Sequence, residues 1–301
     1  KAMKRLLMTF LMTVFVIAPS CGGGGDSNEE PDNPYEWGKG DGKDEPGEEG
    51  KTFYPKTEGS FRIMTYNVGA FCKYISAMNQ NIDLVAKIIK EVDADAVGLN
   101  ELDSMNTRHN VNQVAILAQT LGDWQWHFGK GIDYRGGSYG NGVVVPKGVA
   151  IVDKYTVPLP NTTDYESRSI AVVETDKYVI AASHLDHSSE EYIQSQILAV
   201  NAWAQSKYLN YSKPVFYLGD MNSVPSSAAI KSLETCWDVI SSKENTAGGT
   251  APATTCIDYI FHYKNSASVK VLGSHTISKT YCGDVSKASD HLPVYVDVIL
   301  N

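Results

Sequence analysis

Between residues 60 and 301 the chain alternates short apolar runs of strand length with stretches of helical periodicity. Residues 61–68 alternate as a strand does, and residues 82–92 place apolar side chains at helical spacing. We expect further strands at 94–99, 124–128, 142–145, 169–174, 178–183, 215–218, 257–262, 268–272 and 292–299, and helices at 111–121, 189–208 and 226–233. Because helices fall between groups of strands, the pattern predicts sheets covered by helices, an α/β or α+β fold.

The charge of the chain is distributed unevenly. Its net charge is −9, and residues 21–50 hold ten acidic residues against two basic ones. Residues 51–301 are nearly balanced, with 25 acidic and 21 basic residues and no basic tail. This balance argues against a polybasic nucleic-acid binder.

The first twenty residues have the pattern of a secretory signal. Lys4 and Arg5 precede an apolar run over residues 6–19, which is shorter than the roughly 20 residues of a membrane span. The break at residues 17–21 resembles a bacterial lipobox with Cys21 as the lipidated residue. An ordinary cleaved signal with an incidental cysteine is the alternative. We therefore expect a signal peptide over 1–20.

Residues 21–50 are rich in glycine, proline and acids and contain almost no apolar side chains. Such a segment buries too little surface to offset its ordering entropy, so it predicts a disordered tether behind the lipidated cysteine. The expected location is the bacterial cell envelope, lipid-anchored to the outer membrane on its periplasmic or surface face. The expected domain spans 51–301, as a monomer.

Four cysteines lie beyond Cys21, and none belongs to a Cys-x-x-Cys pair, so a zinc site has little support. An oxidising compartment allows disulfides in three connectivities, and four free thiols are the alternative. These cysteines are Cys72, Cys236, Cys256 and Cys282.

Acids, amides and histidines collect where the expected strands begin or end, which is where a chain leaves the core and can aim a side chain into a shared cleft. Taken singly, each cluster is an ordinary turn, but six of one chemical character indicate a site. The clusters are Asn67, Asn100–Glu101, His184–Asp186, Gly219–Asn222, Asp258 and Ser289–His291.

Carboxylate and amide oxygens suit a hard cation such as Mg²⁺, for which Mn²⁺ is a possible substitute. Two histidines, each close to an aspartate, suit proton transfer. The sequence has no Gly-x-Ser-x-Gly elbow and no glycine-rich phosphate loop with a lysine. Together these residues predict metal-assisted attack of water on a phosphate ester.

The same clusters, in the same order, resemble the endonuclease/exonuclease/phosphatase superfamily, which includes deoxyribonuclease I, AP endonucleases, neutral sphingomyelinases and inositol polyphosphate 5-phosphatases. The resemblance covers residues 60–299, with Asn100–Glu101 standing where the family's Gln-Glu dipeptide is familiar. It implies a four-layer sandwich of two packed mixed β-sheets flanked by helices, with the cleft at one sheet edge.

The resemblance also implies roles for individual residues. Glu101 and Asp290 would bind the divalent ion, with Asn67 as a ligand or a neighbour of one. His291, oriented by Asp258, would be the acid or stabilise the phosphoryl group, and Asp220 would activate water. The remaining contacts to phosphate or to the metal shell would come from Asn222, His184 with Asp186 as a weaker companion, Arg168, Asn141 and Tyr139. For Arg168, a surface ion pair with Glu166 is the alternative.

We expect a metal-dependent phosphoesterase acting on a small or lipid-linked phosphoester. The basic residues near the clusters suffice for one phosphate group but are few for a duplex, namely Arg108, Arg135, Arg168 and Lys287. A secreted endonuclease or exonuclease acting on DNA or RNA is the first alternative. An inactive binding module of the same fold is the second, and a structural envelope lipoprotein is a third class.

Overall fold

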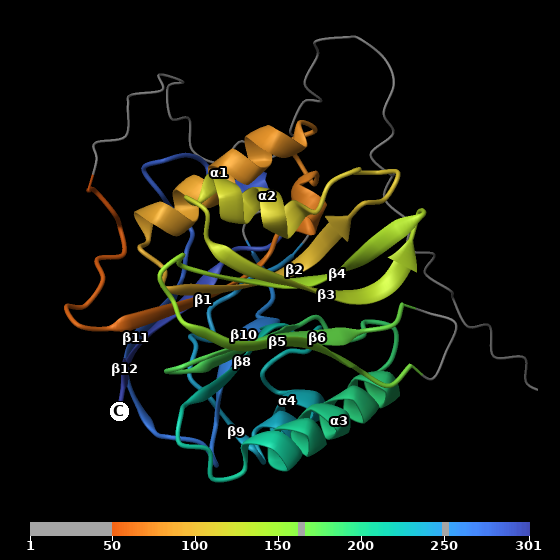
Figure 1. Ribbon diagram of the computed structural model, residues 1–301, viewed down its shortest axis with the longest axis vertical. Helices are drawn as coiled ribbons and strands as arrows, with labels where there is room; N and C mark the ends of the chain where they lie inside the picture. Colours follow the sequence, from red (N-terminus) through yellow and green to blue (C-terminus); the bar gives the residue numbers. More distant parts are fainter. Residues whose placement is uncertain (1–49, 162–165, 249–252) are drawn as a thin grey trace, which may run out of the picture.

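Two six-stranded sheets pack face to face and carry helices on their outer faces, as the computed structural model shows for residues 50–161, 166–248 and 253–301 (Figure 1). The first sheet has the strand order β11 (Val269–Thr276), β12 (Val294–Leu300), β1 (Phe61–Asn67), β2 (Ala96–Ser104), β4 (Gly137–Val145) and β3 (Gln125–Tyr134). The second has the order β5 (Ile151–Pro158), β6 (Ser169–Thr175), β7 (Val179–Ser183), β8 (Val215–Asp220), β10 (Asp258–Tyr263) and β9 (Trp237–Val239). The expected four-layer sandwich of mixed sheets is confirmed.

Helices cover the outer face of each sheet (Figure 1). The first sheet carries α1 (Met78–Glu91) and α2 (Gln113–Thr120), whose apolar sides share one core with β1 and β2. The second sheet carries α3 (Glu190–Tyr208) and α4 (Ala228–Leu233), which share another core with β7 and β8. A third cluster, made of short aliphatic side chains with one Phe and one Tyr, fills the space between the sheets. Each face of both sheets is therefore buried over its central strands.

The short turn η1 (Gly69–Phe71) follows β1, and the short helix α5 (Val285–Ala288) precedes β12. Both lie at the ends of central strands of the first sheet. These two elements therefore lie next to two of the polar clusters of the sequence, Asn67 and Ser289–His291.

The sequence pattern missed strand β5 and predicted β3 and β4 too short, and the structure explains both differences. β5 lies at the edge of the second sheet with five of its eight residues exposed, so it lacks an apolar run. β3 and β4 run on into a glycine-rich segment of low strand propensity. There a Cβ on Gly129 would lie 2.7 Å from the Cβ of Ala171 in the facing sheet. Glycine in this segment therefore permits close packing of the sheets.

The expected signal peptide, Cys21 and most of the tether lie outside the described residues, which begin at residue 50. Among the described residues, no helix is long and apolar enough to span a membrane. Among the described residues no disulfide joins the four remaining cysteines, which agrees with the alternative without disulfides.

A buried ion pair joins β1 to β12 near the start of β1, at the end of that strand opposite to Asn67. Arg62 is 0% exposed and forms two 2.7 Å bonds to the carboxylate of Asp297. We expect Asp297→Ala to lower the free energy of unfolding by about 3–5 kcal/mol, because it leaves the guanidinium buried without a counter-ion. Urea denaturation measures this loss. The control is Asp123→Ala, which breaks the exposed pair with Lys147 and should cost less than about 1 kcal/mol. Equal losses in the two variants would contradict the prediction.

Candidate active site

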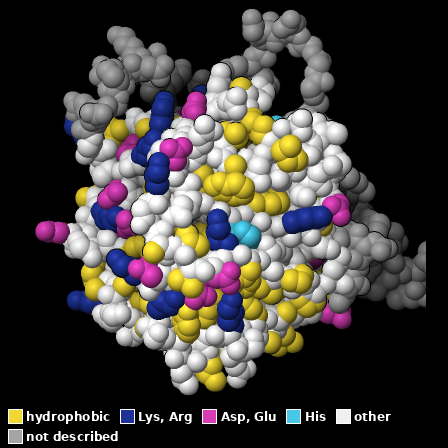
Figure 2. Space-filling model, in the orientation of Figure 1, with side chains coloured by type: hydrophobic (Ala, Val, Ile, Leu, Met, Phe, Trp, Pro, Cys, Tyr) yellow, Lys and Arg dark blue, Asp and Glu magenta, His cyan; other side chains and the backbone are white. Residues whose placement is uncertain are grey.

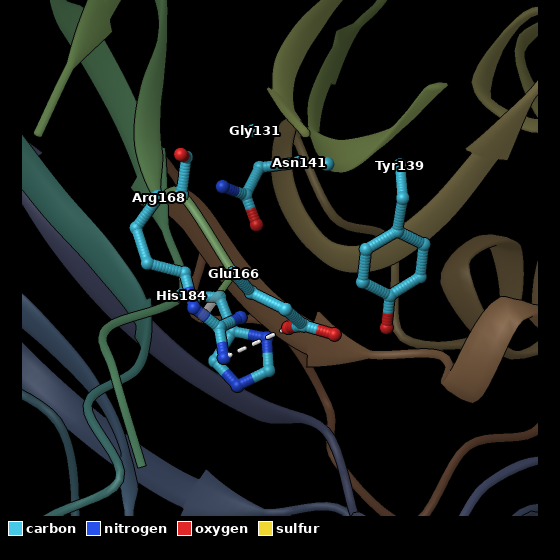
Figure 3. A pocket seen from close by; sticks show the side chains of 8 residues that line it. Gly131, Tyr139, Asn141, Glu166, Arg168 and His184 are labelled. Atoms are coloured by element: carbon cyan, nitrogen blue, oxygen red, sulfur yellow. Dashed lines mark ion pairs between the residues drawn. The ribbon is translucent and has the colours of Figure 1, made fainter. Parts of the chain in front are cut away.

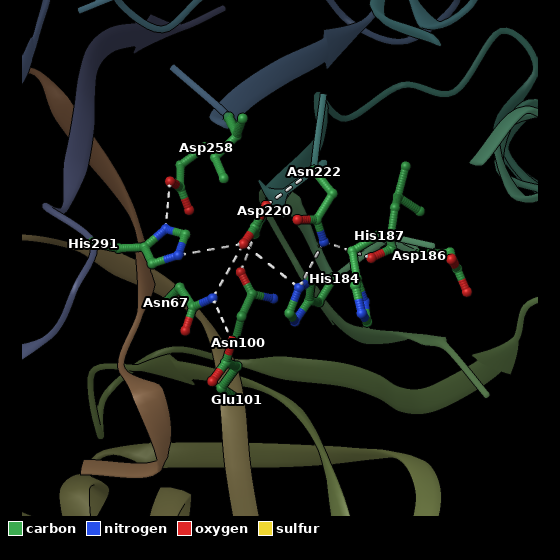
Figure 4. A network of polar contacts seen from close by, with 12 residues as sticks. Asn67, Asn100, Glu101, His184, Asp186, His187, Asp220, Asn222, Asp258 and His291 are labelled. Atoms are coloured by element: carbon green, nitrogen blue, oxygen red, sulfur yellow. Dashed lines mark hydrogen bonds and ion pairs between the residues drawn. The ribbon is translucent and has the colours of Figure 1, made fainter. Parts of the chain in front are cut away.

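The polar clusters meet at one edge of the two sheets (Figure 4). The parallel strands β1 and β2 pair Asn67 with Asn100, and the antiparallel strands β8 and β10 pair Asp220 with Asp258. Gly219 has φ +138, and a Cβ there would lie 1.9 Å from the carbonyl oxygen of Ser183. The Gly-Asp-x-Asn motif therefore requires its glycine, because only glycine lets the end of β8 lie this close to the end of β7.

Asn100 and Glu101 do not end β2, contrary to the sequence expectation. The strand continues to Ser104 through a bulge, where its register with β4 shifts between Leu99 and Leu102. Glu101 lies in this bulge with φ 61, a conformation rarely adopted by residues other than glycine. A bulge re-aims one side chain of a strand, and here it directs Glu101 to the cluster (Figure 4).

Asp258 and His291 form a buried dyad. His291 Nδ1 lies 2.9 Å from Asp258 Oδ2, and its Nε2 lies 3.6 Å from Asp220 Oδ2. Burial alone would lower the pKa of His291, but the Asp258 carboxylate raises it to about 10. The imidazole is thus held as a cation with its Nε2 proton directed at the centre of the cluster.

Asp220 occupies that centre. Its Oδ1 accepts the backbone N–H of Asn222 at 2.8 Å, and its Oδ2 accepts Asn67 Nδ2 at 3.1 Å. Burial raises the pKa of the Asp220 carboxyl above its ordinary value. A fixed carboxylate with a raised pKa is suited to accept a proton from water.

His184 differs from His291 in charge. Asn222 Nδ2 donates to His184 Nε2 at 2.9 Å and to the Leu185 carbonyl at 2.9 Å. Burial, aided by the nearby Arg168, lowers the pKa of His184 to about 3. His184 is therefore a neutral imidazole whose proton is on Nδ1. Its expected companion Asp186 instead accepts bonds from the backbone and hydroxyl of Ser188 and belongs to a turn.

Two groups of side chains could bind a cation. Asp220, Asp258 and His291 bring ligand atoms within 4.8 Å of one another, but their hydrogen bonds already tie them into the dyad and its neighbour. Glu101 and Asp290 stand outside that group: the Lys73 ammonium is 2.7 Å from Asp290 Oδ2, and its charge also acts on Glu101. Two carboxylates that attract the same cation suit a divalent metal, so Glu101 and Asp290 fit the expected ion better.

Asn67 supports this pair without facing a cation itself. Its Nδ2 donates to Glu101 Oε1 at 3.0 Å, and its Oδ1 accepts the backbone N–H of Gly69 at 3.1 Å. The amide oxygen is thus occupied, and the amide nitrogen orients Glu101 and Asp220. Of the two roles expected for Asn67, the geometry favours a neighbour of a ligand.

A small pocket adjoins His184 (Figure 3). Arg168 is 6% exposed and pairs at 3.1 Å with Glu166, whose side chain is 43% exposed, so the ion pair expected as the alternative for this residue is present with its arginine buried. Arg168 Nε and His184 Nδ1 are buried donors that lack a hydrogen-bond partner among the described residues. Asn141 and Tyr139 line the same pocket. The pocket therefore offers hydrogen-bond donors to an oxygen-rich group.

Two residues that sequence reasoning left without a role belong to the site. Asn100 Nδ2 donates to Asn141 Oδ1 at 2.8 Å, and Asn100 Oδ1 accepts the backbone N–H of Asp220 at 3.0 Å, so this amide joins the two sheets. Lys73 is the other, and it reaches the site through its ion pair with Asp290. Lys73 follows the turn η1 by two residues, and no motif of the sequence includes it.

The family model described as the endonuclease/exonuclease/phosphatase family matches residues 64–291. No curated protein matches the chain. Among solved structures, the chain is similar to an endonuclease/exonuclease/phosphatase from Bacteroides vulgatus, with 20% identity and a TM-score of 0.66 over 80% of this chain and 99% of that one. A mannosyl-6-phosphatase of Bacteroides thetaiotaomicron gives 17% identity and 0.66 over 79% and 99%. The human Nocturnin catalytic domain with bound sulfate gives 17% identity and 0.60 over 83% and 97%.

Proposed function

The chain belongs to the endonuclease/exonuclease/phosphatase family, and on that premise we propose that it is a metal-dependent phosphoesterase that hydrolyses a small phosphoester by attack of water. The observation that carries the proposal is the Asp258–His291–Asp220 arrangement, in which a cationic imidazole and a carboxylate of raised pKa lie 3.6 Å apart. These are an acid and a base held next to each other at one site.

Each side chain has a distinct task in this reaction. Asp220 orients the attacking water and accepts its proton, and the Asn222 backbone holds this carboxylate in place. His291 directs its Nε2 proton at the phosphoryl group or the leaving oxygen, while Asp258 fixes the ring through Nδ1. Glu101 and Asp290 would hold Mg²⁺ or Mn²⁺, and the bound ion would neutralise charge on the phosphate oxygens as the reaction proceeds.

A functional enzyme is favoured over an inactive binding module, because Glu101, Asp220, Asp258, Asp290 and His291 are all retained and adjoin one another. A binding module has no need of a buried acid and base in opposite protonation states. Burying two titratable groups in this way costs stability, and such groups are found most often at catalytic sites.

We further propose that the preferred substrate has a polar leaving group, such as a sugar or polyol phosphate. The pocket beside His184 is small and contains buried donors at Arg168 and His184 and a carboxylate at Glu166. A hydroxyl-rich group satisfies such a mixture, whereas a lipid chain would leave the donors unpaired. On the face shown in Figure 2, Lys and Arg side chains are scattered among Asp and Glu and form no continuous basic surface for a duplex.

A substrate panel tests this proposal. The full chain is assayed with Mg²⁺ against sugar phosphates, inositol phosphates, a sphingomyelin-type lipid, a bis-aryl phosphodiester, DNA and RNA. We expect the highest kcat/KM with a sugar or inositol phosphate, and no turnover in excess chelator. Plasmid nicking at nanomolar enzyme that outpaces every small ester and falls steeply with salt would instead establish a nuclease.

A further inference from the structure

Lys73 contacts one of the two carboxylates of the candidate cation site. Its ammonium is 2.7 Å from Asp290 Oδ2, and its side chain is 39% exposed. The charge of Lys73 also acts on Glu101. One lysine therefore offsets part of the negative charge of the two carboxylates that fit a metal.

The backbone before Lys73 is held in an unusual conformation that places this side chain. Ala70 and Phe71 have φ values of 53 and 55, in the left-handed region that non-glycine residues rarely adopt. Both residues are buried, and Gln113 Nε2 donates to the Ala70 carbonyl at 2.7 Å. The stem of Lys73 also lies against Gly69, since a Cβ on that glycine would be 3.4 Å from Lys73 Cβ and Cδ. A turn fixed at this cost holds the backbone that leads to Lys73 in one conformation.

We propose that Lys73 is an internal counter-ion of the cation site, which a divalent metal must displace from Asp290 and Glu101 in order to bind. The inference rests on the proposed function, because it assumes that these two carboxylates are the metal ligands. An ammonium and a divalent ion repel each other, so the same oxygens cannot serve both at full strength. Lys73 therefore weakens metal binding while it stabilises the metal-free protein. A lysine suits this exchange, because its compact charge sits on a flexible stem that can swing towards solvent.

Mn²⁺ binding to the full chain, measured by isothermal titration calorimetry without any substrate, tests the competition. Lys73→Met keeps much of the aliphatic stem and removes the charge, so we expect it to bind Mn²⁺ at least about fivefold more tightly than the wild type. Lys73→Arg keeps the charge and should stay close to the wild type. The matched control is Lys147→Met. Lys147 lies two residues after Val145, the last residue of β4, and pairs with Asp123, so this variant removes an equal charge from an exposed ion pair outside the site. It should leave the affinity unchanged.

Thermal unfolding supplies a second readout. The metal-free Lys73→Met protein should melt below the wild type, since its carboxylates have lost their counter-ion, and saturating Mn²⁺ should raise its melting temperature by more. Equal or weaker Mn²⁺ binding by Lys73→Met would overturn the competition while leaving the proposed function intact. Absence of saturable Mn²⁺ binding in both wild type and Lys73→Met would overturn the metal site itself, and the competition with it.

Discussion

Glu101→Gln is expected to lower kcat by about 10³-fold or more, with little change in the melting temperature of the metal-free protein. The substitution keeps the shape of the side chain and removes its charge. Lewis-acid stabilisation by a bound metal is worth several kcal/mol, and each ~1.4 kcal/mol is a factor of ten in rate. Stability should change little because Glu101 is only partly buried and its contacts are with polar groups at the rim of the sheet.

Asn67→Ala is the graded comparison for this variant. The Asn67 amide donates to Glu101 and Asp220 but has its oxygen bound to Gly69, so its loss should disorient the carboxylates without removing either. Loss of a residue that supports a metal ligand typically costs about 10–100-fold. Steady-state kinetics over a range of Mg²⁺ concentrations measure both effects. A Glu101→Gln enzyme that keeps wild-type kcat, or a wild-type enzyme that stays active in excess chelator, would remove Glu101 and the metal from the reaction.

His291→Ala is expected to lower kcat by about 10²–10⁴-fold, the usual contribution of a general acid or base. The variant removes the cationic Nε2–H that lies 3.6 Å from Asp220. Asp258→Asn should cause a loss of similar size, because Asp258 both orients the ring and supplies the charge that keeps it protonated. Circular dichroism and urea denaturation are the controls that test whether each variant is folded.

The double variant distinguishes a coupled pair from two independent residues. If Asp258 acts only through His291, the double variant should be little slower than the slower of the two single variants. His262→Ala is the control, because this histidine also lies on β10 but bonds to the Ala267 carbonyl. It should retain activity near that of the wild type. Rate losses that multiply in the Asp258→Asn, His291→Ala enzyme would show that the two residues contribute separately.

Most of the secondary structure followed from local patterning, because burial of a strand or helix face requires a periodicity that a sequence displays. The helix expected at 189–208 and the strand pair expected at 169–174 and 178–183 are present within a residue or so. The two edge strands of the second sheet were not predicted. β5 and β9 have little apolar periodicity, and pairing with a neighbouring strand forms them.

The sequence by itself determined which chemical groups gather at the site and in what order along the chain. Polar residues that interrupt apolar strands are placed at sheet ends by the burial of their neighbours, so Asn67, Asp220, Asp258 and His291 were identifiable one by one. Asn67 and Asp258 lie at strand ends as expected. The glycine of the Gly-Asp-x-Asn motif also had to be glycine, for a reason that its φ of +138 now explains.

Only the tertiary structure decided which of these groups touch. The bulge that aims Glu101 arises from a register shift against β4, and a register between distant segments leaves no mark in either segment alone. The opposite charge states of His184 and His291 arise from their different neighbours, an amide and Arg168 for one and Asp258 for the other. The contact of Lys73 with Asp290 joins residues more than 200 positions apart. Contacts of this kind depend on how two sheets and their connecting turns pack, because electrostatic interactions act through space and not along the chain.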